Sequence, residues 1–329
     1  MQIVLTGDVM LGRLVDHYVI RNQSIVPDKI WSDVLPLMLK ADRRLINLEC
    51  VISDRGHEWQ ADSKAFHFRA HPRAIDFLRA AKIDCVTLAN NHVLDYGTDA
   101  LLECLALLDR AGIKRAGAGV SLMEALTPAI LDLPQGRLGV VSITNNEPEW
   151  EAGEQKPGIC YIAYDAKGLV EPYRSRLAQV LKQVRRQADL VIISAHVGPN
   201  WGSPSVAMRA LAYQVIDLGA DLYWGHSNHT PQGIELYKGK TIFYSTGDFI
   251  DDYAVDSAER NDLSFLFTLE LERGRVARIV LHPVCIEDLY VRLAKEKEVA
   301  FLQETMQAKC KSFGSRILFH DGVGTVELP

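Results

Sequence analysis

The sequence has no excess of basic residues and few cysteines. Thirty-six Lys and Arg stand against 42 Asp and Glu, which gives a formal net charge of −6. A general nucleic-acid binder needs a cationic surface to neutralise phosphates, so we expect no nucleic-acid partner. The six cysteines are scattered with no CxxC pair, which indicates reduced thiols in a reducing compartment.

The chain also lacks a long apolar run. The first apolar segment, residues 2–5, is followed at once by Gly7 and Asp8, and no basic segment precedes it. We therefore expect no signal peptide, no membrane anchor and a cytoplasmic protein. Hydrophobic residues at 48% and a mean hydropathy of −0.01 exclude disordered, collagen-like and multi-span membrane classes.

Short β-branched runs alternate with amphipathic stretches, which predicts an α/β fold. The expected strands are 2–5, 44–47, 85–88, 138–142, 190–194 and 222–224. The expected helices are 72–81, 98–111, 169–188 and 206–218. No linker or repeat divides the chain, so we expect a single domain over residues 1–329.

The pattern changes after Gly233, where strands follow one another without helices. These strands are expected at 234–237, 241–245, 264–271 and 275–282. They predict an antiparallel extension of the sheet, or a second sheet packed on the first. A long helix is expected at 288–311, within a C-terminal helix and strand extension at 286–329.

Residues able to bind a divalent cation follow five of the expected strands. They are Asp8, Asn47, Glu49, Asn91, His92, His196, His226 and His229. Since the carboxyl ends of parallel strands form one edge of a sheet, and ligands bind outside it, we expect these side chains to meet. A separation of His196 from Glu49 above about 10 Å would contradict this, because one ion could not contact both.

The mixture of carboxylate, amide and imidazole suits Mn²⁺, Fe²⁺, Zn²⁺ or Mg²⁺, and no cysteine joins it. One ion, or two ions bridged by a carboxylate, could acidify a water and bind a phosphoryl or carbonyl oxygen. Each residue alone has a structural explanation: Asp8 could be a turn or N-cap residue, and His196 a hydrogen-bonded core histidine. Jointly they favour a metal site, because the structural explanations are independent of one another.

Several further residues could contact a substrate. Arg13 and Arg69 could each offer a bidentate guanidinium to an anionic or carbonyl oxygen, a surface salt bridge being the alternative. Asn200 and Trp201 could form a wall for the substrate, although a tryptophan more often packs. Asp248 could orient a ligating histidine.

Five segments carry a family resemblance, and they follow one another in order over the first three quarters of the chain. They are Gly-Asp-Val-Met-Leu-Gly-Arg at 7–13, Asn-Leu-Glu at 47–49, Leu-Ala-Asn-Asn-His-Val-Leu-Asp-Tyr-Gly at 88–97, His-Val-Gly-Pro-Asn-Trp at 196–201 and Gly-His-Ser-Asn-His-Thr-Pro-Gln-Gly at 225–233. Together they resemble the CapA family of poly-γ-glutamate capsule biosynthesis proteins, which is related to calcineurin-like metallophosphatases.

The resemblance implies a metallophosphatase-like β-sandwich flanked by helices, a four-layer α/β/β/α fold. It implies a metal site at the strand ends, with His92 as a catalytic residue that protonates a leaving group or polarises an oxygen. The implied ligands are Asp8, Glu49 or Asn47, Asn91, His196, His226 and His229. The sequence departs from the phosphatase pattern at Met10, where the Asp-x-His motif has its histidine.

These observations predict a metal-dependent hydrolase-like enzyme that acts on a carboxylate, amide or phosphate-containing substrate, either a small molecule or a peptide such as polyglutamate. His92 and Arg13 are the predicted catalytic residues, and Arg69, Asn200 and Trp201 are predicted to bind substrate. Two alternatives stay open. One is a metal-dependent peptide epimerase, and the other is a non-catalytic polyglutamate-handling protein, which Met10 favours slightly.

Overall fold

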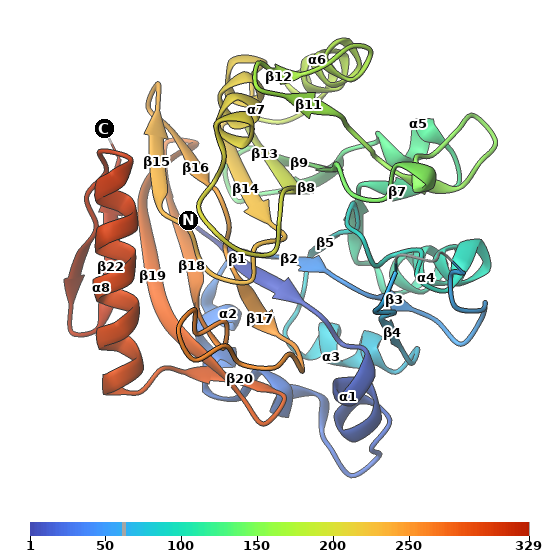
Figure 1. Cartoon of the computed structure of the whole chain (residues 1–329), viewed down its shortest axis with the longest axis horizontal. Coiled ribbons are helices and arrows are strands. Elements are labelled where there is room, and N and C mark those ends of the chain that lie inside the picture. The colour runs from blue at the N-terminus through green and yellow to red at the C-terminus, as the bar shows by residue number, and fades with distance from the viewer. Residues whose placement is uncertain (61–63, 329) are drawn as a thin grey trace.

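Two β-sheets stacked face to face form the centre of the fold, and helices cover both outer faces (Figure 1). The computed structural model describes residues 1–60 and 64–328. The arrangement is a four-layer α/β/β/α sandwich, as the family resemblance implied.

The larger sheet has ten strands in the order β21-β22-β19-β18-β1-β2-β5-β6, with β17 beside β1 and β20 beside β19. Its parallel part consists of β1 (Gln2–Val9), β2 (Arg43–Leu48), β5 (Cys85–Thr87), β6 (Lys114–Ala116) and β17 (Asp248–Ile250). Its antiparallel part consists of β18 (Leu263–Glu272), β19 (Arg275–Glu287), β20 (Tyr290–Leu293), β21 (Leu318–His320) and β22 (Val323–Glu327).

The smaller sheet has six strands in the order β15-β16-β14-β13-β9-β8. Its four inner strands are parallel: β9 (Arg137–Thr144), β13 (Leu190–His196), β14 (Leu222–His226) and β16 (Lys240–Phe243). Its antiparallel edges are β8 (Ala129–Asp132) and β15 (Ile234–Tyr237).

Alternation along each strand separates the layers, because successive side chains point to opposite faces of a sheet. Leu190 and Ile192 of β13 lie in the apolar cluster between the two sheets, together with Ile3 and Leu5 of β1. The intervening Val191 of β13 packs instead with the outer helices. The uniformly apolar strands are therefore strands buried on both faces.

The outer face of the larger sheet is covered by α1 (Arg13–Val15), α2 (Leu35–Lys40), α3 (Ala74–Ala80) and α4 (Gly97–Ala111). The smaller sheet is covered by α5 (Leu122–Ala125), α6 (Tyr173–Val184) and α7 (Val206–Asp217). The last helix, α8 (Glu296–Ser312), runs along one end of the sandwich and inserts Leu302, Met306 and Cys310 between the sheets (Figure 1). None of the helices within the described residues is long and apolar enough to span a membrane.

Short elements complete the chain. They are η1 (Asp16–Ile20), η2 (Pro27–Val34), η3 (Pro148–Trp150), β3 (Val51–Ile52), β4 (Arg69–Ala70), β7 (Ala118–Gly119), β10 (Gly158–Ile159), β11 (Tyr164–Asp165) and β12 (Gly168–Leu169). The strands expected from the sequence are all present, some of them longer than expected.

Two expected helices are wrong at their starts. The helix expected from residue 169 begins at Tyr173, because residue 169 pairs within the β11–β12 hairpin. The helix expected over 288–311 begins only at Glu296, because residues 290–293 form β20 and pair with β19. The strands after Gly233 do both things that were expected: β15 and β16 complete a second sheet, and β18 and β19 extend the first.

Candidate metal centre

Four buried ionisable residues lie at the carboxyl ends of strands from both sheets. Asp8 is near the end of β1 and Glu49 follows β2, whereas His196 and His226 are the last residues of β13 and β14. Each is at most 2% exposed. The parallel register brings His196 level with His226 and Asp8 level with Asn47. The stacking of the two sheets then brings the pairs together, so that Asp8 lies beside both His196 and His226.

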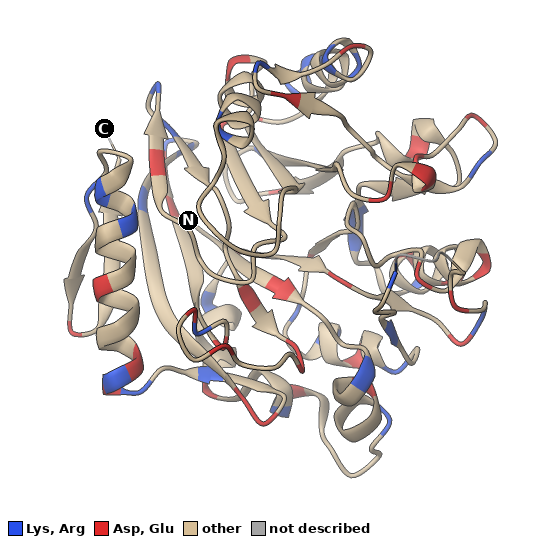
Figure 2. Cartoon of the chain, in the orientation of Figure 1, with Lys and Arg blue, Asp and Glu red and all other residues tan. Residues whose placement is uncertain are grey.

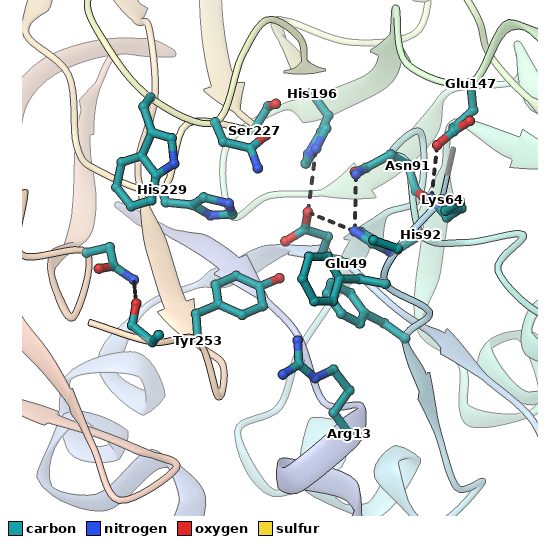
Figure 3. Close-up of a pocket in the computed structure, with 17 residues that line it drawn as sticks. Arg13, Glu49, Lys64, Asn91, His92, Glu147, His196, Ser227, His229 and Tyr253 are labelled. Atoms are coloured by element: carbon teal, nitrogen blue, oxygen red, sulfur yellow. Dashed lines mark hydrogen bonds and ion pairs between the residues drawn. The ribbon is translucent and has the colours of Figure 1, made fainter. Parts of the chain in front are cut away.

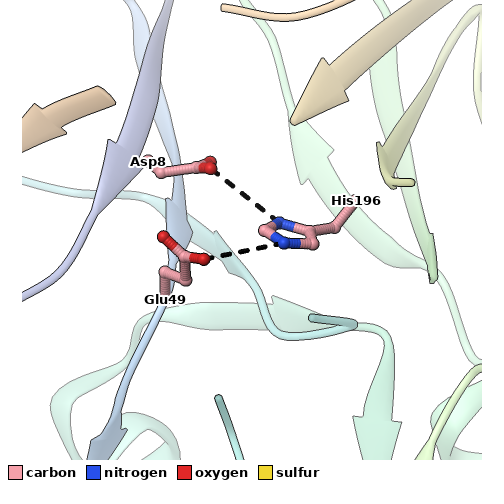
Figure 4. Close-up of side chains that lie close together, drawn as sticks. All are labelled: Asp8, Glu49 and His196. Atoms are coloured by element: carbon pink, nitrogen blue, oxygen red, sulfur yellow. Dashed lines mark ion pairs between the residues drawn. The ribbon is translucent and has the colours of Figure 1, made fainter. Parts of the chain in front are cut away.

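The ligand atoms of Asp8, Glu49 and His196 all lie within 4.8 Å of one another (Figure 4). Glu49 Oε1 is 3.6 Å from His196 Nε2, and Asp8 Oδ2 is 3.9 Å from His196 Nδ1. These separations are longer than hydrogen bonds, and they are within the range that two ligands of one cation adopt. Glu49 and His196 therefore meet, although 147 positions separate them in the sequence.

Asp8 is oriented by polar neighbours. Asn47 Nδ2 donates to Asp8 Oδ1 at 2.9 Å, and the Asn47 amide oxygen accepts from Thr87 at 3.1 Å and from Asn90 at 3.3 Å. The Asn47 oxygen is thus already engaged, so this residue fits a role in orienting Asp8 better than the predicted role of metal ligand. His226 Nδ1 approaches Asp8 Oδ1 to 2.6 Å, without the direction of a hydrogen bond.

His229 is held by a carboxylate, in the arrangement expected for Asp248. Its Nδ1 lies 3.0 Å from Asp248 Oδ1, and its ring packs edge to face with Trp201 and Tyr253. β17 pairs with β1 so that Asp248 is level with Asp8, and Figure 2 shows the acidic residues of these two strands beside each other. A carboxylate on the second nitrogen of a histidine is the usual partner of a metal-ligating imidazole.

His92 lies in the loop after β5, on the side of Glu49 opposite to His229 (Figure 3). Its Nε2 is 3.9 Å from Glu49 Oε1 (Figure 3). Its Nδ1 is 2.6 Å from Asp95 Oδ2. Phe68 stacks on the imidazole at a centroid distance of 3.8 Å. Asp95 is paired in turn with Lys64 at 3.1 Å. Sequence reasoning missed Asp95 and Lys64, although the spacing of three residues between His92 and Asp95 was a usable signal.

Several buried polar atoms around the centre have no hydrogen-bond partner among the described residues. They are Glu49 Oε2, Asn91 Oδ1, both ring nitrogens of His226, Asp248 Oδ2 and Asp251 Oδ2. Leaving such a group unpaired costs about 1–3 kcal/mol, and more when it is charged. The donor set of oxygens and imidazoles therefore fits a divalent cation, which would satisfy several of these atoms at once.

The protonation states also fit. Burial opposes ionisation of Asp8, but His226 and His196 outweigh it and lower its pKa to about 2. Burial lowers the pKa of His196 to about 3, so that its imidazole is neutral at pH 7, as a metal ligand must be. Burial, and then the charge of Asp8, raises the pKa of Glu49 well above its ordinary value. A bound cation would supply the positive charge that this buried carboxylate lacks.

The centre opens into a cleft of about 550 Å³. The cleft is lined by several of the predicted residues, namely Arg13, Glu49, Asn91, His92, His196, Asn200, Trp201 and His229. Arg13 has a left-handed backbone with φ of 51°, and its guanidinium pairs with Asp252 at 3.4 Å. A residue other than glycine with a left-handed backbone is strained, and such residues are concentrated at functional sites.

Arg69 does not reach the cleft. It lies in β4 between the buried Phe68 and Ala70, and alternation along the strand turns its side chain away from theirs. Its guanidinium stacks over Tyr96 at 4.0 Å and donates to the Arg55 carbonyl at 3.3 Å. The predicted substrate contact of Arg69 is therefore not supported by its position.

Sequence comparison with known proteins places this chain in a family. The sequence model described as "Bacterial capsule synthesis protein PGA_cap" matches residues 2–253. A probable polyglutamine synthesis accessory protein of Mycobacterium tuberculosis is 31% identical, over 96% of this chain and 93% of its own length. The PGA biosynthesis protein CapA of Bacillus subtilis is 26% identical, over 86% of this chain and 70% of its own.

Among solved structures, GAP50, the anchor in the inner membrane complex of Plasmodium, matches with a TM-score of 0.38 and 11% identity, over 92% of this chain and 93% of its own. The family match extends from the first strand to the loop after β17, and so includes every strand end that contributes to the candidate centre. The chain belongs to the bacterial capsule synthesis protein family PGA_cap, the CapA family that its motifs resemble.

Proposed function

We propose that the chain is a metal-dependent hydrolase of this family, acting on an amide, carboxylate or phosphate-containing substrate. The observation that carries the proposal is the convergence of Asp8, Glu49 and His196, with unpartnered buried polar atoms around them, beside a cleft that Glu49 and His196 line. A divalent ion held by Asp8, Glu49, Asn91, His196 and His226, with His229 beside them, would lower the pKa of a bound water and polarise a substrate oxygen.

His92 is the proton-transfer group of the proposal. Its Nδ1–H faces the Asp95 carboxylate, which leaves Nε2 as the atom directed towards Glu49 and the cleft. Nε2 accepts a hydrogen bond from Asn91 Nδ2 at 3.1 Å in the absence of substrate, and so carries the lone pair. From this position it takes a proton from an attacking water, or returns one to the departing oxygen or nitrogen.

Arg13 and the Asn200–Trp201 pair are proposed to hold the substrate. The Arg13 guanidinium offers paired N–H donors to a carboxylate or phosphate, and Trp201 presents a 41% exposed indole at the cleft. The relatives are named for polyglutamine and PGA synthesis. A glutamate polymer fits this cleft chemically, because it offers carboxylates to Arg13 and amide bonds to the centre.

Metal analysis and turnover test the proposal together. Wild-type protein should bind one or two Mn²⁺ ions and hydrolyse p-nitrophenyl phosphate mono- or diesters, or poly-γ-glutamate. The double variant His196→Ala, His226→Ala should lose both properties. His92→Ala should keep the metal and lose about 10²–10⁴-fold in rate. His320→Ala, which removes an imidazole from a 91% exposed side chain, is the matched control.

Other results would select the alternatives. Deuterium uptake at Cα from heavy water without hydrolysis would favour peptide epimerisation. Metal binding without turnover of any phosphate ester or polyglutamate would favour a protein that handles polyglutamate without cleaving it. Wild-type protein that binds no divalent ion would contradict the metal centre itself.

A further inference from the structure

The Tyr253 hydroxyl is a polar group of the cleft that the proposed function leaves unused. Tyr253 lies three residues after β17, and its ring is wedged between Phe68, at a centroid distance of 5.8 Å, and His229, at 5.0 Å. Figure 3 shows the ring directed into the cleft with its oxygen facing Glu49. Within the described residues, Tyr253 makes its hydrogen bond through the backbone N–H and not through this oxygen, although the ring that carries the oxygen is closely packed.

Hydrogen bonds hold the segment that carries Tyr253 in place beside the cleft. The Tyr253 backbone N–H donates to Asp251 Oδ1 at 2.8 Å, and Asn261 Nδ2 donates to the Ala254 carbonyl at 3.3 Å. These two hydrogen bonds fix the backbone at Tyr253 and at the next residue, and the backbone in turn limits where the ring can lie. A rigidly held group needs little reorganisation when it meets a ligand.

The same segment also positions Arg13. The Asp252 carboxylate accepts the Leu14 backbone N–H at 2.8 Å and pairs with the Arg13 guanidinium at 3.4 Å. The Asp252 side chain is fully buried, whereas Arg13 is 34% exposed and lines the cleft. Consecutive residues thus supply a hydroxyl donor and fix a cationic donor, and Figure 3 shows Tyr253 and His92 on opposite sides of Glu49.

We infer that the Tyr253 hydroxyl donates a hydrogen bond to an oxyanion held at the metal centre, with Arg13 as the charged donor beside it. The inference rests on the proposed function and narrows its ligand to an oxyanion, a phosphate group or the tetrahedral form of an attacked carbonyl. A phenol is a donor at neutral pH because its ordinary pKa is about 10. Donors aimed at developing negative charge contribute strongly to catalysis, and the loss of one commonly costs about 10²–10³-fold in kcat.

The test uses Tyr253→Phe, which removes the hydroxyl and keeps the ring between Phe68 and His229. Mn²⁺ content and the binding of orthovanadate, a mimic of phosphoryl-transfer geometry, are measured by titration calorimetry on the Mn²⁺-loaded full chain. Tyr290→Phe is the matched control, because Tyr290 lies on β20 and does not line the cleft. We expect unchanged Mn²⁺ content, orthovanadate binding at least tenfold weaker, and kcat for a phosphate ester about 100-fold lower at a KM within threefold of wild type.

Each other outcome overturns the inference in a recognisable way. Equal orthovanadate affinity in Tyr253→Phe and wild type would show that the hydroxyl does not contact the oxyanion. Loss of Mn²⁺ in Tyr253→Phe would make the hydroxyl a metal ligand instead of a donor. Wild-type protein that binds Mn²⁺ but not orthovanadate would overturn the oxyanion pocket and leave the metal centre standing, whereas a wild type without Mn²⁺ binding would overturn the proposed function as well.

Discussion

Leu5 of β1 and Ile192 of β13 are fully buried in the apolar cluster between the sheets, whereas Asp8 and His196, a few residues further along the same strands, are about as deeply buried beside other polar side chains. Apolar burial contributes about 25 cal/mol per Å² to stability. Burial of polar atoms without partners subtracts from it. One pair of strands therefore builds both the stable interior and an edge whose buried polar atoms lack partners among the described residues.

The comparison teaches where stability and function are located. The interior between the sheets would fold with any well-packed apolar residues, because packing and volume decide it. The edge gathers Glu49, Asp248 and Asp251, three buried carboxyl groups whose pKa values burial raises well above normal. Substitutions in the two regions should consequently change stability in opposite directions.

The largest expected effect belongs to the interior. Phe267 of β18 is fully buried and packs edge to face with Phe243 at 5.1 Å and with Phe265 at 5.8 Å. Phe267→Ala should lower the free energy of unfolding by about 3–5 kcal/mol, through lost burial and a residual cavity. Urea denaturation measures the loss, and Phe267→Leu should cost markedly less. A loss under about 1 kcal/mol would mean that the interior is not closely packed.

A smaller effect of opposite sign is expected at the edge. The folded-state pKa of Glu49 lies above its unfolded value of 4.5, so the stability linked to its proton is lost as the pH rises above that value. Glu49→Gln removes this loss and should stabilise the chelator-treated protein by about 1–3 kcal/mol at neutral pH, while abolishing metal binding. Glu304→Gln, on the exposed side of α8, is the control and should change little. A metal-free Glu49→Gln variant less stable than wild type would contradict the contrast between the two regions.

The smallest expected effect is the pH-dependent contribution of one ion pair to the stability of the interior. Arg292 donates to both carboxylate oxygens of Glu298 at 2.8 Å, which joins β20 to the helix that closes the interior, and Arg292 lowers the pKa of Glu298 to about 2 from 4.5. A lowered folded-state pKa contributes stability above pH 4.5 that is lost as the pH falls towards 2. Because the pair is partly exposed, Glu298→Gln should cost about 1 kcal/mol at neutral pH and almost nothing near pH 2. Denaturation curves at several pH values measure the difference, and a cost independent of pH would show that the ion pair is not its source.

Much of the fold and of the candidate centre could be predicted from the sequence because both depend on strand ends. Apolar runs identify parallel strands, and the residue after each run must lie at the shared edge. This places Asp8, Glu49, His196 and His226 together without knowledge of any loop. The helix expected over 288–311 was wrong at its start for a related reason: residues 290–293 are an edge strand whose short alternation resembles the first turn of a helix.

The other side chains of the cleft come from loops, and the periodicity of a sequence does not predict the path of a loop. Lys64 and Tyr253 reach the cleft from irregular segments, and their partners are set by tertiary contacts alone. Arg69 was misplaced because the β3–β4 pairing, which fixes its direction, involves strands of only two residues each. The sequence thus predicts the residues at the strand ends, but it does not predict which residues line the walls of the cleft.

Anomalous diffraction from crystals grown with Mn²⁺ tests the central claim most directly, because it locates the ion and counts it. The account predicts a peak in the crevice at the strand ends, about 2.0–2.2 Å from a Glu49 carboxylate oxygen and from a His196 ring nitrogen. A peak that contacts neither side chain, or no peak in protein that binds Mn²⁺ in solution, would contradict it.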